Sequence, residues 1–536
     1  MNGEPRHGDP SGHYAFVNPD APKGGHLKQA ATGTFDTLNP FSIKGNPAKE
    51  LDLVYDRLMA RNWNEPFTLY PLIASSIDVS EDNRLIVIHI NPLARFNDGT
   101  PITADDIVFS FETLKEKGRP NMRQVYRQVG SISKLDGNSI EIILGDTANR
   151  ETPMIIAMMP VLSKAWWADR DFEATLLDFP NSSGPYLVES VDAGRSITYK
   201  RNPDYWAAHL LPRKGMYNFD RITYDYFRDD NVALEALLKG TLNFRREWDN
   251  RKWNSLYRSG DVEKLEFKHG RPQQVRAMIF NMRRPPFDDL NVRKALYMAF
   301  DGEWIGKNIY QDTLTRTNSY FPNSQLSANI SLPTADMSPR ERLKEAKDLL
   351  TRSGWEIVDN KLQKGGQPMA FEILLTQAED EKIALSFINS LKRLGIQANI
   401  RTLDTASFQR RLLDYDYDMI FHHWQNSLSP GTEQVVYWSC EAADQPGRFN
   451  YAGICREDLD KLANDIANVP TYEELVDMAQ QIDTILLEEY ISIPLFYNEA
   501  DLIAVQKDLF AYPAQTPLYG PVIESWWIPE NDANTE

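Results

Sequence analysis

The chain has 536 residues, and its 58 basic and 76 acidic residues give a net charge of -18. This balance argues against a nucleic-acid partner, because phosphate binding needs clustered Lys and Arg. The length is too great for one hydrophobic core and predicts two or three domains. No apolar run approaches the roughly 20 residues that span a bilayer, so we expect a soluble chain. Residues 1–25 lack the basic start and apolar core of an intact secretory signal, which leaves either a cytoplasmic protein or an exported one whose signal was removed.

Residues 85–118 predict a strand, a tight turn and a capped helix. LIVIHI (85–90) alternates as a strand does, NDG (97–99) is a turn signal, and Thr103 with Asp106 forms an N-terminal capping pair. The following apolar residues recur with helical spacing as far as Gly118. This local geometry accounts for three carboxylates that would otherwise be candidates for cation binding or acid-base chemistry: Asp98, Asp105 and Asp106.

Two further segments read as alternating strands and helices, and together they predict two α/β lobes. In the first, 219–228 is a strand, 231–240 a helix and 241–244 the next strand. The second predicts a βαβαβ unit with parallel strands over 371–376, 380–395, 397–402, 407–416 and 417–424. Helices follow at 456–469 and 472–489, then a short apolar run at 491–497.

Cys440 and Cys455 enclose a loop that contains Gly and Pro. Two cysteines at short spacing predict one disulfide in an oxidising compartment, which would stabilise the fold by roughly 3 kcal/mol. The alternative is two buried free thiols.

No common local motif of a hydrolase, kinase or dehydrogenase is present in the sequence. His422 and His423 are adjacent and point to opposite faces of a strand, so they do not ligate one metal together. Phe244 and Trp424 lie at the carboxyl ends of predicted parallel strands, where ligands of open α/β sheets bind. Core packing is the alternative for either ring. WQNSLSPG (424–431) mixes an indole with amides and hydroxyls, as a ligand-binding wall does.

FNDGTPITADDIVFS (96–110) resembles the signature of the dipeptide- and oligopeptide-binding family, family 5, of bacterial ABC-transporter extracellular solute-binding proteins. Blocks at 182–206, 219–244 and 280–301 are similar to further family segments and follow in the expected order. Residues 17–41, FNYAGI (449–454) and SWW (525–527) resemble the YejA-type branch. The resemblance covers most of the chain.

The resemblance implies an α/β type II periplasmic-binding-protein fold with two hinged lobes and an extra subdomain. Lobe I is expected from 1–45, 183–272 and 497–536, subdomain II from 46–182 and lobe III from 273–496. The resemblance also implies an exported, periplasmic and monomeric protein without cofactor, metal site or catalytic residues. Such a receptor delivers its ligand to a membrane ABC permease and its ATPase subunits.

In this family the ligand backbone usually adds as a strand to the segment that matches ATGTFDTLNP (31–40). Predicted contacts there are Thr34, Phe35 and Asn39. A second group follows the strand predicted at 241–244 and comprises Phe244, Arg245, Arg246 and Glu247. The remaining contacts are predicted at Arg283 and, around HHWQNS, at His423, Trp424, Gln425, Asn426 and Ser427. We expect Trp424→Ala to weaken ligand binding well beyond tenfold while the fold stays intact.

Family members that bind peptides usually carry an Asp three residues after the Trp of this motif, where it pairs with the ligand's amino group. This chain has Ser427 there, and a hydroxyl does not neutralise an ammonium. The ligand therefore either lacks a conventionally anchored amine or meets another acid such as Glu247. The YejA-type branch suggests peptides of unusual form, including peptidoglycan-derived muropeptides and modified peptides. Arg245, Arg246 or Arg283 would then pair with ligand carboxylates.

The sequence thus predicts a non-catalytic peptide receptor of an ABC importer. The alternatives are a periplasmic hydrolase of peptides or cell-wall fragments, and a receptor for another solute such as an opine or a sugar conjugate.

Overall fold

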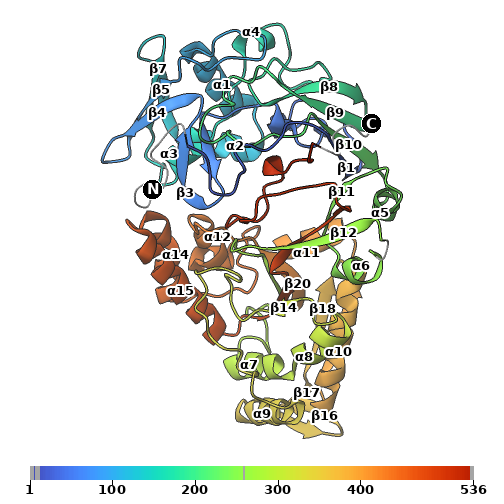
Figure 1. Cartoon of the computed structure of the whole chain (residues 1–536). Coiled ribbons are helices and arrows are strands. Elements are labelled where there is room, and N and C mark those ends of the chain that lie inside the picture. Colours follow the sequence, from blue (N-terminus) through green and yellow to red (C-terminus); the bar gives the residue numbers. More distant parts are fainter. Residues whose placement is uncertain (1–4, 6–11, 258–259, 531–536) are drawn as a thin grey trace. The chain divides into compact units, whose positions relative to one another are not determined.

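A computed structural model of the chain describes residue 5 and residues 12–257 and 260–530 (Figure 1). The chain forms two compact units, Met1–His269 with Ala500–Glu536, and Gly270–Glu499, called unit 1 and unit 2 below. The division into lobe I, subdomain II and lobe III remains a prediction. None of the described helices is both long and apolar enough to cross a membrane.

Unit 1 is built around four groups of strands. A mixed sheet has the order β1 (His26–Thr32), β10 (Arg221–Phe227), β9 (Ser196–Arg201) and β8 (Tyr186–Asp192). An antiparallel sheet has the order β11 (Phe244–Glu247), β23 (Ala500–Gln506) and β12 (Val262–Lys268). A third has the order β4 (Ala74–Val79), β5 (Leu85–Ile90), β7 (Ser139–Leu144) and β6 (Val129–Lys134), and β2 (Met59–Asn62) pairs with β3 (Glu65–Pro71).

The helices of unit 1 are mostly short. They are α1 (Ala104–Lys117), α2 (Pro120–Tyr126), α3 (Thr152–Ala157), α4 (Lys164–Trp167), α5 (Asp230–Leu238) and α6 (Asn250–Ser255), with 3-10 turns η1 (Leu51–Leu53) and η3 (Ile523–Ser525).

The prediction for 85–118 is confirmed by β5 and α1. The Asp106 carboxylate accepts hydrogen bonds from the Thr103 N–H and hydroxyl at 3.0 and 2.7 Å, which caps the helix. Asp98 accepts from Thr100 N–H at 2.9 Å within the turn, and Asp105 pairs with Lys134 at 2.9 Å. All three carboxylates therefore serve local structure.

The prediction for 241–244 is wrong in register and in direction. The strand is β11, Phe244–Glu247, and it pairs antiparallel with β23 instead of lying in a parallel sheet. Asn243 explains the difference, because its side chain donates to His26 O at 2.7 Å and accepts from Lys28 N–H at 2.7 Å on β1. These bonds fix the preceding loop against β1, so Arg245, Arg246 and Glu247 lie within a strand and not after one.

Unit 2 contains a five-stranded sheet in the order β19 (Gln397–Thr402), β18 (Ala370–Leu375), β20 (Met419–Trp424), β13 (Val275–Phe280) and β21 (Ser492–Pro494). β18 is parallel to both β19 and β20, which confirms the predicted βαβαβ unit. Smaller pairings join β14 (Thr315–Arg316) to β22 (Phe496–Tyr497), and β15 (Glu356–Val358), β16 (Lys361–Lys364) and β17 (Gln367–Pro368) to one another.

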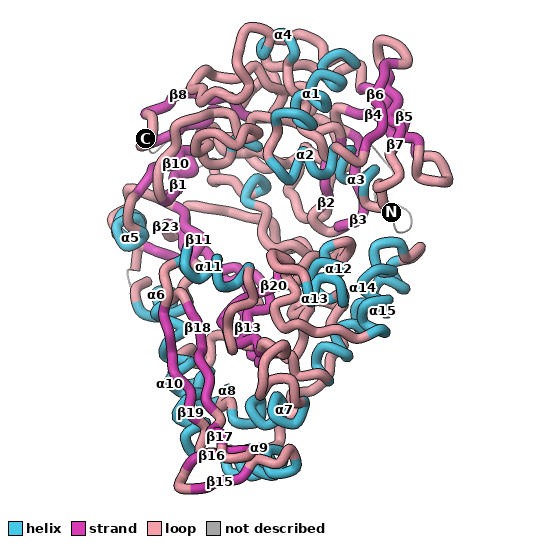
Figure 2. Tube along the Cα trace, turned by 180° about the vertical axis from the view of Figure 1, so that it is seen from behind, coloured by secondary structure: helices cyan, strands magenta, loops and turns pink. Residues whose placement is uncertain are grey.

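Helices cover both faces of the five-stranded sheet. They are α7 (Leu290–Ala299), α8 (Gly302–Asn308), α9 (Pro339–Arg352), α10 (Ala378–Arg393), α11 (Thr405–Leu413), α12 (Glu433–Trp438), α13 (Cys440–Asp444), α14 (Glu457–Asp465), η2 (Ile466–Asn468) and α15 (Tyr472–Glu488). α10 runs beside β18 and β19 (Figure 2). Alternate residues of β13 enter two separate cores: Met278 and Phe280 pack with Phe387 of α10, whereas Ile279 packs with Ile482 of α15.

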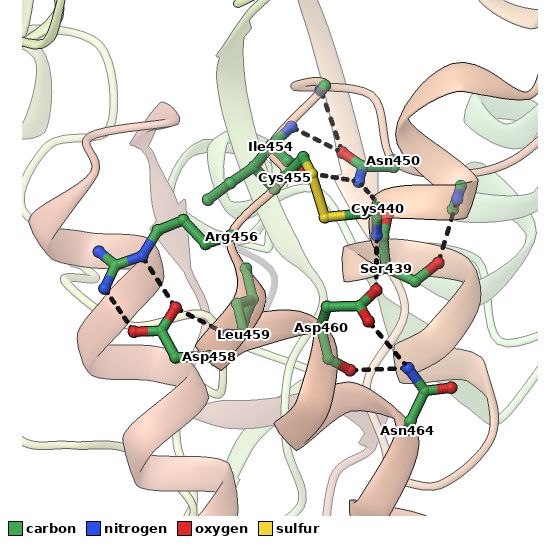
Figure 3. The surroundings of a disulfide bond; sticks show 12 residues. Ser439, Cys440, Asn450, Ile454, Cys455, Arg456, Asp458, Leu459, Asp460 and Asn464 are labelled. Carbon is green, nitrogen blue, oxygen red and sulfur yellow. Dashed lines mark hydrogen bonds and ion pairs between the residues drawn. A yellow bond between two sulfur atoms is a disulfide. The ribbon is translucent and has the colours of Figure 1, made fainter.

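The predicted disulfide joins Cys440 and Cys455 (Figure 3). Asn450 braces the enclosed loop by donating from its side chain to Ser439 O at 3.1 Å and Ile454 O at 2.9 Å. The Cys440 N–H donates to the Asp460 carboxylate of α14 at 2.7 Å. The bridge thus ties this loop to the helices that follow it.

Candidate functional site

The edge of β1 that faces away from β10 forms hydrogen bonds with Asn243, but only at His26 and Lys28, in the first half of the strand. The Asn243 N–H donates to Lys28 O at 3.1 Å, and the two side-chain bonds to β1 lie at the same edge. Backbone groups alternate between the two edges of a strand, so those of Ala30 and Thr32 point the same way as those of Lys28. The backbone of Gly33, the residue after Thr32, points to the opposite edge, and its N–H donates to Phe227 O of β10.

The second half of this edge is therefore open. In the described part of the chain, no hydrogen bond from outside β10 reaches the backbone of Ala30 or Thr32. An open strand edge beside a cavity is where an extended peptide adds its own backbone as a further strand.

A cavity of about 340 Å³ lies along this edge within unit 1. Its walls include Gln29, Ala30 and Thr32 of β1, and Arg246 and Trp248 from β11 and the residue after it. Trp248 is 75% exposed, although a large aromatic side chain is usually well buried. An exposed indole at the mouth of a cavity is suited to pack against a ligand.

Arg246 is a partly accessible cation of this wall, as is Lys49, which also lines the cavity. One guanidinium nitrogen donates to Pro521 O at 3.2 Å, and another lies 3.8 Å from Asp501. A third of the side chain remains exposed, so the guanidinium has room to bind a carboxylate.

Arg245, in contrast, is engaged inside unit 1. Its guanidinium lies 3.1 Å from Glu247 and 2.9 Å from Asp230, and its Nε donates to the Tyr257 hydroxyl at 2.9 Å. The bond from Arg245 lowers the pKa of Asp230 to about 2. Glu247 accepts in addition from the N–H groups of Trp248 and Asp249, at 2.8 and 2.9 Å. The ion pair of Arg245 and Glu247 therefore holds β11 and α6 in place.

A second cavity of about 700 Å³, also within unit 1, shares Glu50, Leu53 and Glu524 with the first. Its other walls are rich in aromatic and methionine side chains, among them Tyr126 and Met158. Such walls accept apolar groups of varied shape. Each of the two volumes falls in the range of cavities that hold small-molecule ligands.

The predicted contacts in the segment 31–40 differ in exposure. β1 ends at Thr32, so Thr34 and Phe35 lie beyond the strand. The Thr34 hydroxyl donates to Gly194 O at 3.3 Å from an exposed position, whereas Phe35 is buried against Tyr226. Asn39 is buried, donates to Phe172 O at 2.7 Å and accepts from Phe41 N–H at 3.0 Å. Phe35 and Asn39 support the chain from within.

Trp424 and Arg283 are built into unit 2. Trp424 is 1% exposed, packs on Tyr320, Trp438 and Tyr451, and donates from its indole N–H to Phe449 O at 3.0 Å. This burial argues against the expectation that Trp424→Ala leaves the fold intact, because the ring fills a core.

Arg283 donates to Ala443 O at 2.8 Å and to Asn450 O at 2.8 Å, and its guanidinium lies over the Tyr415 ring at 3.7 Å. These backbone carbonyls occupy the donors that were predicted to pair with ligand carboxylates.

The residues around Trp424 differ in exposure and in hydrogen bonding. The Asn426 side chain donates to Tyr320 O at 2.6 Å and Gln273 O at 3.3 Å, so it links loops of unit 2. Gln425 and Ser427 are exposed, and His423 is half-buried. Their contact with a ligand stays a prediction, as does that of Thr34, Phe244 and Arg246.

Sequence reasoning missed Trp248, Thr32 and the shared acids Glu50 and Glu524. The sequence offered a local indication for Trp248, because this residue directly follows the predicted contacts Phe244–Glu247. It offered none for Glu50 and Glu524, because these acids are far apart in the chain and only folding brings them to the same cavities.

Residues 68–445 match the bacterial extracellular solute-binding proteins, family 5 (middle region). The chain belongs to this family of extracellular solute-binding proteins, and its fold is the α/β type II periplasmic-binding-protein fold.

Two relatives and one solved structure place the chain further. It is 34% identical to the uncharacterized protein YejA of Escherichia coli K12, over 99% of this chain and 93% of the relative. It is 33% identical to the peptidoglycan-binding protein YepA of Agrobacterium fabrum, over 98% of this chain and 95% of the relative. The oligopeptide-binding protein AppA of Bacillus subtilis, solved with a nonapeptide, superposes with a TM-score of 0.68 at 20% identity, covering 95% of this chain and 100% of that one. The resemblance to the YejA-type branch is thus confirmed.

Proposed function

We propose that this protein is the periplasmic, monomeric receptor of an ABC importer and that its ligands are peptides, including fragments of peptidoglycan. It captures the ligand without breaking a bond and delivers it to a membrane permease. The observation that carries the proposal is the open edge of β1 at Ala30 and Thr32, which faces a cavity with an accessible Arg246 and an exposed Trp248. The names of the relatives support it, because YepA is described as peptidoglycan-binding.

The chemistry of the cavity suits such a ligand. The strand edge offers backbone donors and acceptors that any peptide backbone satisfies, irrespective of its sequence. Arg246 offers a fork of donors for a carboxylate, and peptidoglycan peptides carry several. Trp248 and the aromatic and methionine side chains of the second cavity provide apolar area that tolerates varied shapes.

The test is to incubate purified protein with murein tripeptide, with an unmodified tripeptide and with the glycan part of a muropeptide alone. Calorimetry is expected to show binding of one or both peptides, and mass spectrometry to recover them intact. Cleaved peptide would instead support a hydrolase. Binding of the glycan with neither peptide would support a receptor for another solute.

A further inference from the structure

Glu524 stands apart from the other acidic groups that line the two cavities of unit 1, because each of those has an ion pair in the described chain. Lys49 pairs with Glu50 at 3.4 Å, Asp52 with Arg57 at 3.1 Å, and Arg213 with Asp56 at 3.0 Å. Asp230 and Arg246 have the ion pairs described above. Within the described residues, no side chain or backbone N–H of another residue donates to the Glu524 carboxylate.

The position of Glu524 is fixed by its backbone. It lies in η3, where its carbonyl accepts from the Tyr217 N–H at 2.6 Å. The next two carbonyls, of Ser525 and Trp526, accept from the Asn218 side chain at 3.3 and 3.0 Å. These bonds fix the backbone that carries the carboxylate, so a ligand that meets it does not have to order this segment of the chain first.

Glu524 also lies where the two cavities meet, since it lines both together with Glu50 and Leu53. Burial raises the pKa of its carboxyl above the usual range and the charge of Glu50 adds to this shift, whereas a bond from its own backbone N–H and the charges of Arg246 and Arg213 oppose it. The carboxylate is thus partly removed from water and accepts no hydrogen bond from another described residue.

We propose that Glu524 binds a primary ammonium group of the ligand. This assignment rests on the function proposed above, and it identifies the chemical group of the ligand that binds where the two cavities meet. A peptide carries both a carboxylate and an ammonium. Arg246 in the first cavity suits the carboxylate, and Glu524 supplies the one acid of these walls that is still without a partner in the described chain.

A metal ion is a poorer candidate for this position. A divalent cation needs several oxygen ligands at once. The described residues contain no group of three or more His, Cys, Asp or Glu side chains that could hold one. An ammonium requires only one carboxylate together with neutral acceptors, which the walls provide.

The experiment compares murein tripeptide with the same tripeptide after acetylation of its amino groups, measured by calorimetry on the whole protein. The variant is Glu524→Gln, which keeps the shape of the side chain and removes its charge. The control is Glu530→Gln, six residues later and exposed. The wild type is expected to bind the free tripeptide at least tenfold more tightly than the acetylated one, and Glu524→Gln to abolish this preference.

The thermal midpoint of ligand-free protein separates this role from a structural one. Glu524→Gln is expected to leave the midpoint unchanged or raised, because the folded protein loses a carboxylate that had no partner. A lowered midpoint together with a retained preference for the free amine would overturn the assignment and leave the proposed function standing. If the wild type binds neither form of murein tripeptide nor the unmodified tripeptide, the proposed function is overturned and this assignment with it.

Discussion

Two of the segments that sequence reasoning selected as ligand contacts, residues 243–247 (NFRRE) in unit 1 and residues 422–427 (HHWQNS) in unit 2, have opposite surroundings. In unit 1 the segment borders a cavity, presents a partly exposed Arg246 and is followed directly by the exposed Trp248. In unit 2 the segment contains Trp424, which is enclosed by other aromatic rings. The comparison teaches that a polar and aromatic composition at a strand end does not by itself distinguish a cavity wall from a core, because other segments decide whether the ring is covered.

The first prediction tests the unit 2 side of this comparison. Trp424→Ala is expected to lower the free energy of unfolding by about 3–5 kcal/mol, because it removes a large buried ring and leaves a cavity. Urea unfolding followed by near-ultraviolet circular dichroism measures the loss. Trp304→Ala is the matched control, since this tryptophan of the same unit is 48% exposed and its removal should have little effect. Equal stability of the two variants would show that Trp424 does not support the core and would favour the earlier prediction that it contacts the ligand.

The second prediction contrasts two adjacent arginines. Arg283→Met removes donors from several backbone carbonyls at once, so we expect a loss of about 3 kcal/mol in the free energy of unfolding. Arg284→Met removes only exposed ion pairs, to Asp416 at 2.8 Å and Asp418 at 3.3 Å, and should cost about 0.5 kcal/mol. If Arg283→Met folds normally and loses ligand affinity instead, Arg283 belongs to the binding site after all.

The third prediction uses His422, which precedes Trp424 on β20. Burial, followed by the charge of His423, lowers the pKa of His422 to about 4. The folded state therefore disfavours the charged form, and stability is complete above the unfolded pKa of about 6.5. It falls as the pH drops from 6.5 towards 4, by roughly 2–3 kcal/mol at most.

His422→Gln removes this titration. Urea midpoints of wild type and variant are measured at pH 7 and at pH 4.5. The midpoint of the wild type relative to that of the variant is expected to be lower at pH 4.5 than at pH 7, because only the wild type must protonate or keep neutral a buried His422. A constant difference between the two proteins would mean that His422 is as accessible to protons in the folded state as in the unfolded one.

Local patterns predicted those parts of the fold whose determinants are near in sequence. The capping pair of Thr103 and Asp106 and the alternation of strand and helix from 371 to 424 act within a few residues, so α1 and the parallel strands of unit 2 follow from them. The register of β11 did not follow, because Asn243 bonds to β1, which is distant in the chain.

The candidate site was predictable only in part for the same reason. Arg246 stands in a conspicuous charged segment, whereas the open edge at Thr32 depends on which strands pair with β1. The burial of Trp424 depends on Trp438 and Tyr451, which follow it in the chain and have no visible relation to it in the sequence. Composition identified residues of unusual chemistry, and tertiary packing decided which of them remained free.

The last prediction tests the unit 1 side of the comparison. Trp248→Ala is expected to weaken binding of murein tripeptide about tenfold, or about 1.4 kcal/mol, because the exposed indole would lose its contact with the ligand. The thermal midpoint without ligand should not change, since so exposed a ring contributes little to packing. Trp248→Phe, which keeps an aromatic face, should recover most of the affinity. An unchanged affinity in Trp248→Ala would show that exposure alone is as poor a guide to the ligand wall in unit 1 as composition was in unit 2.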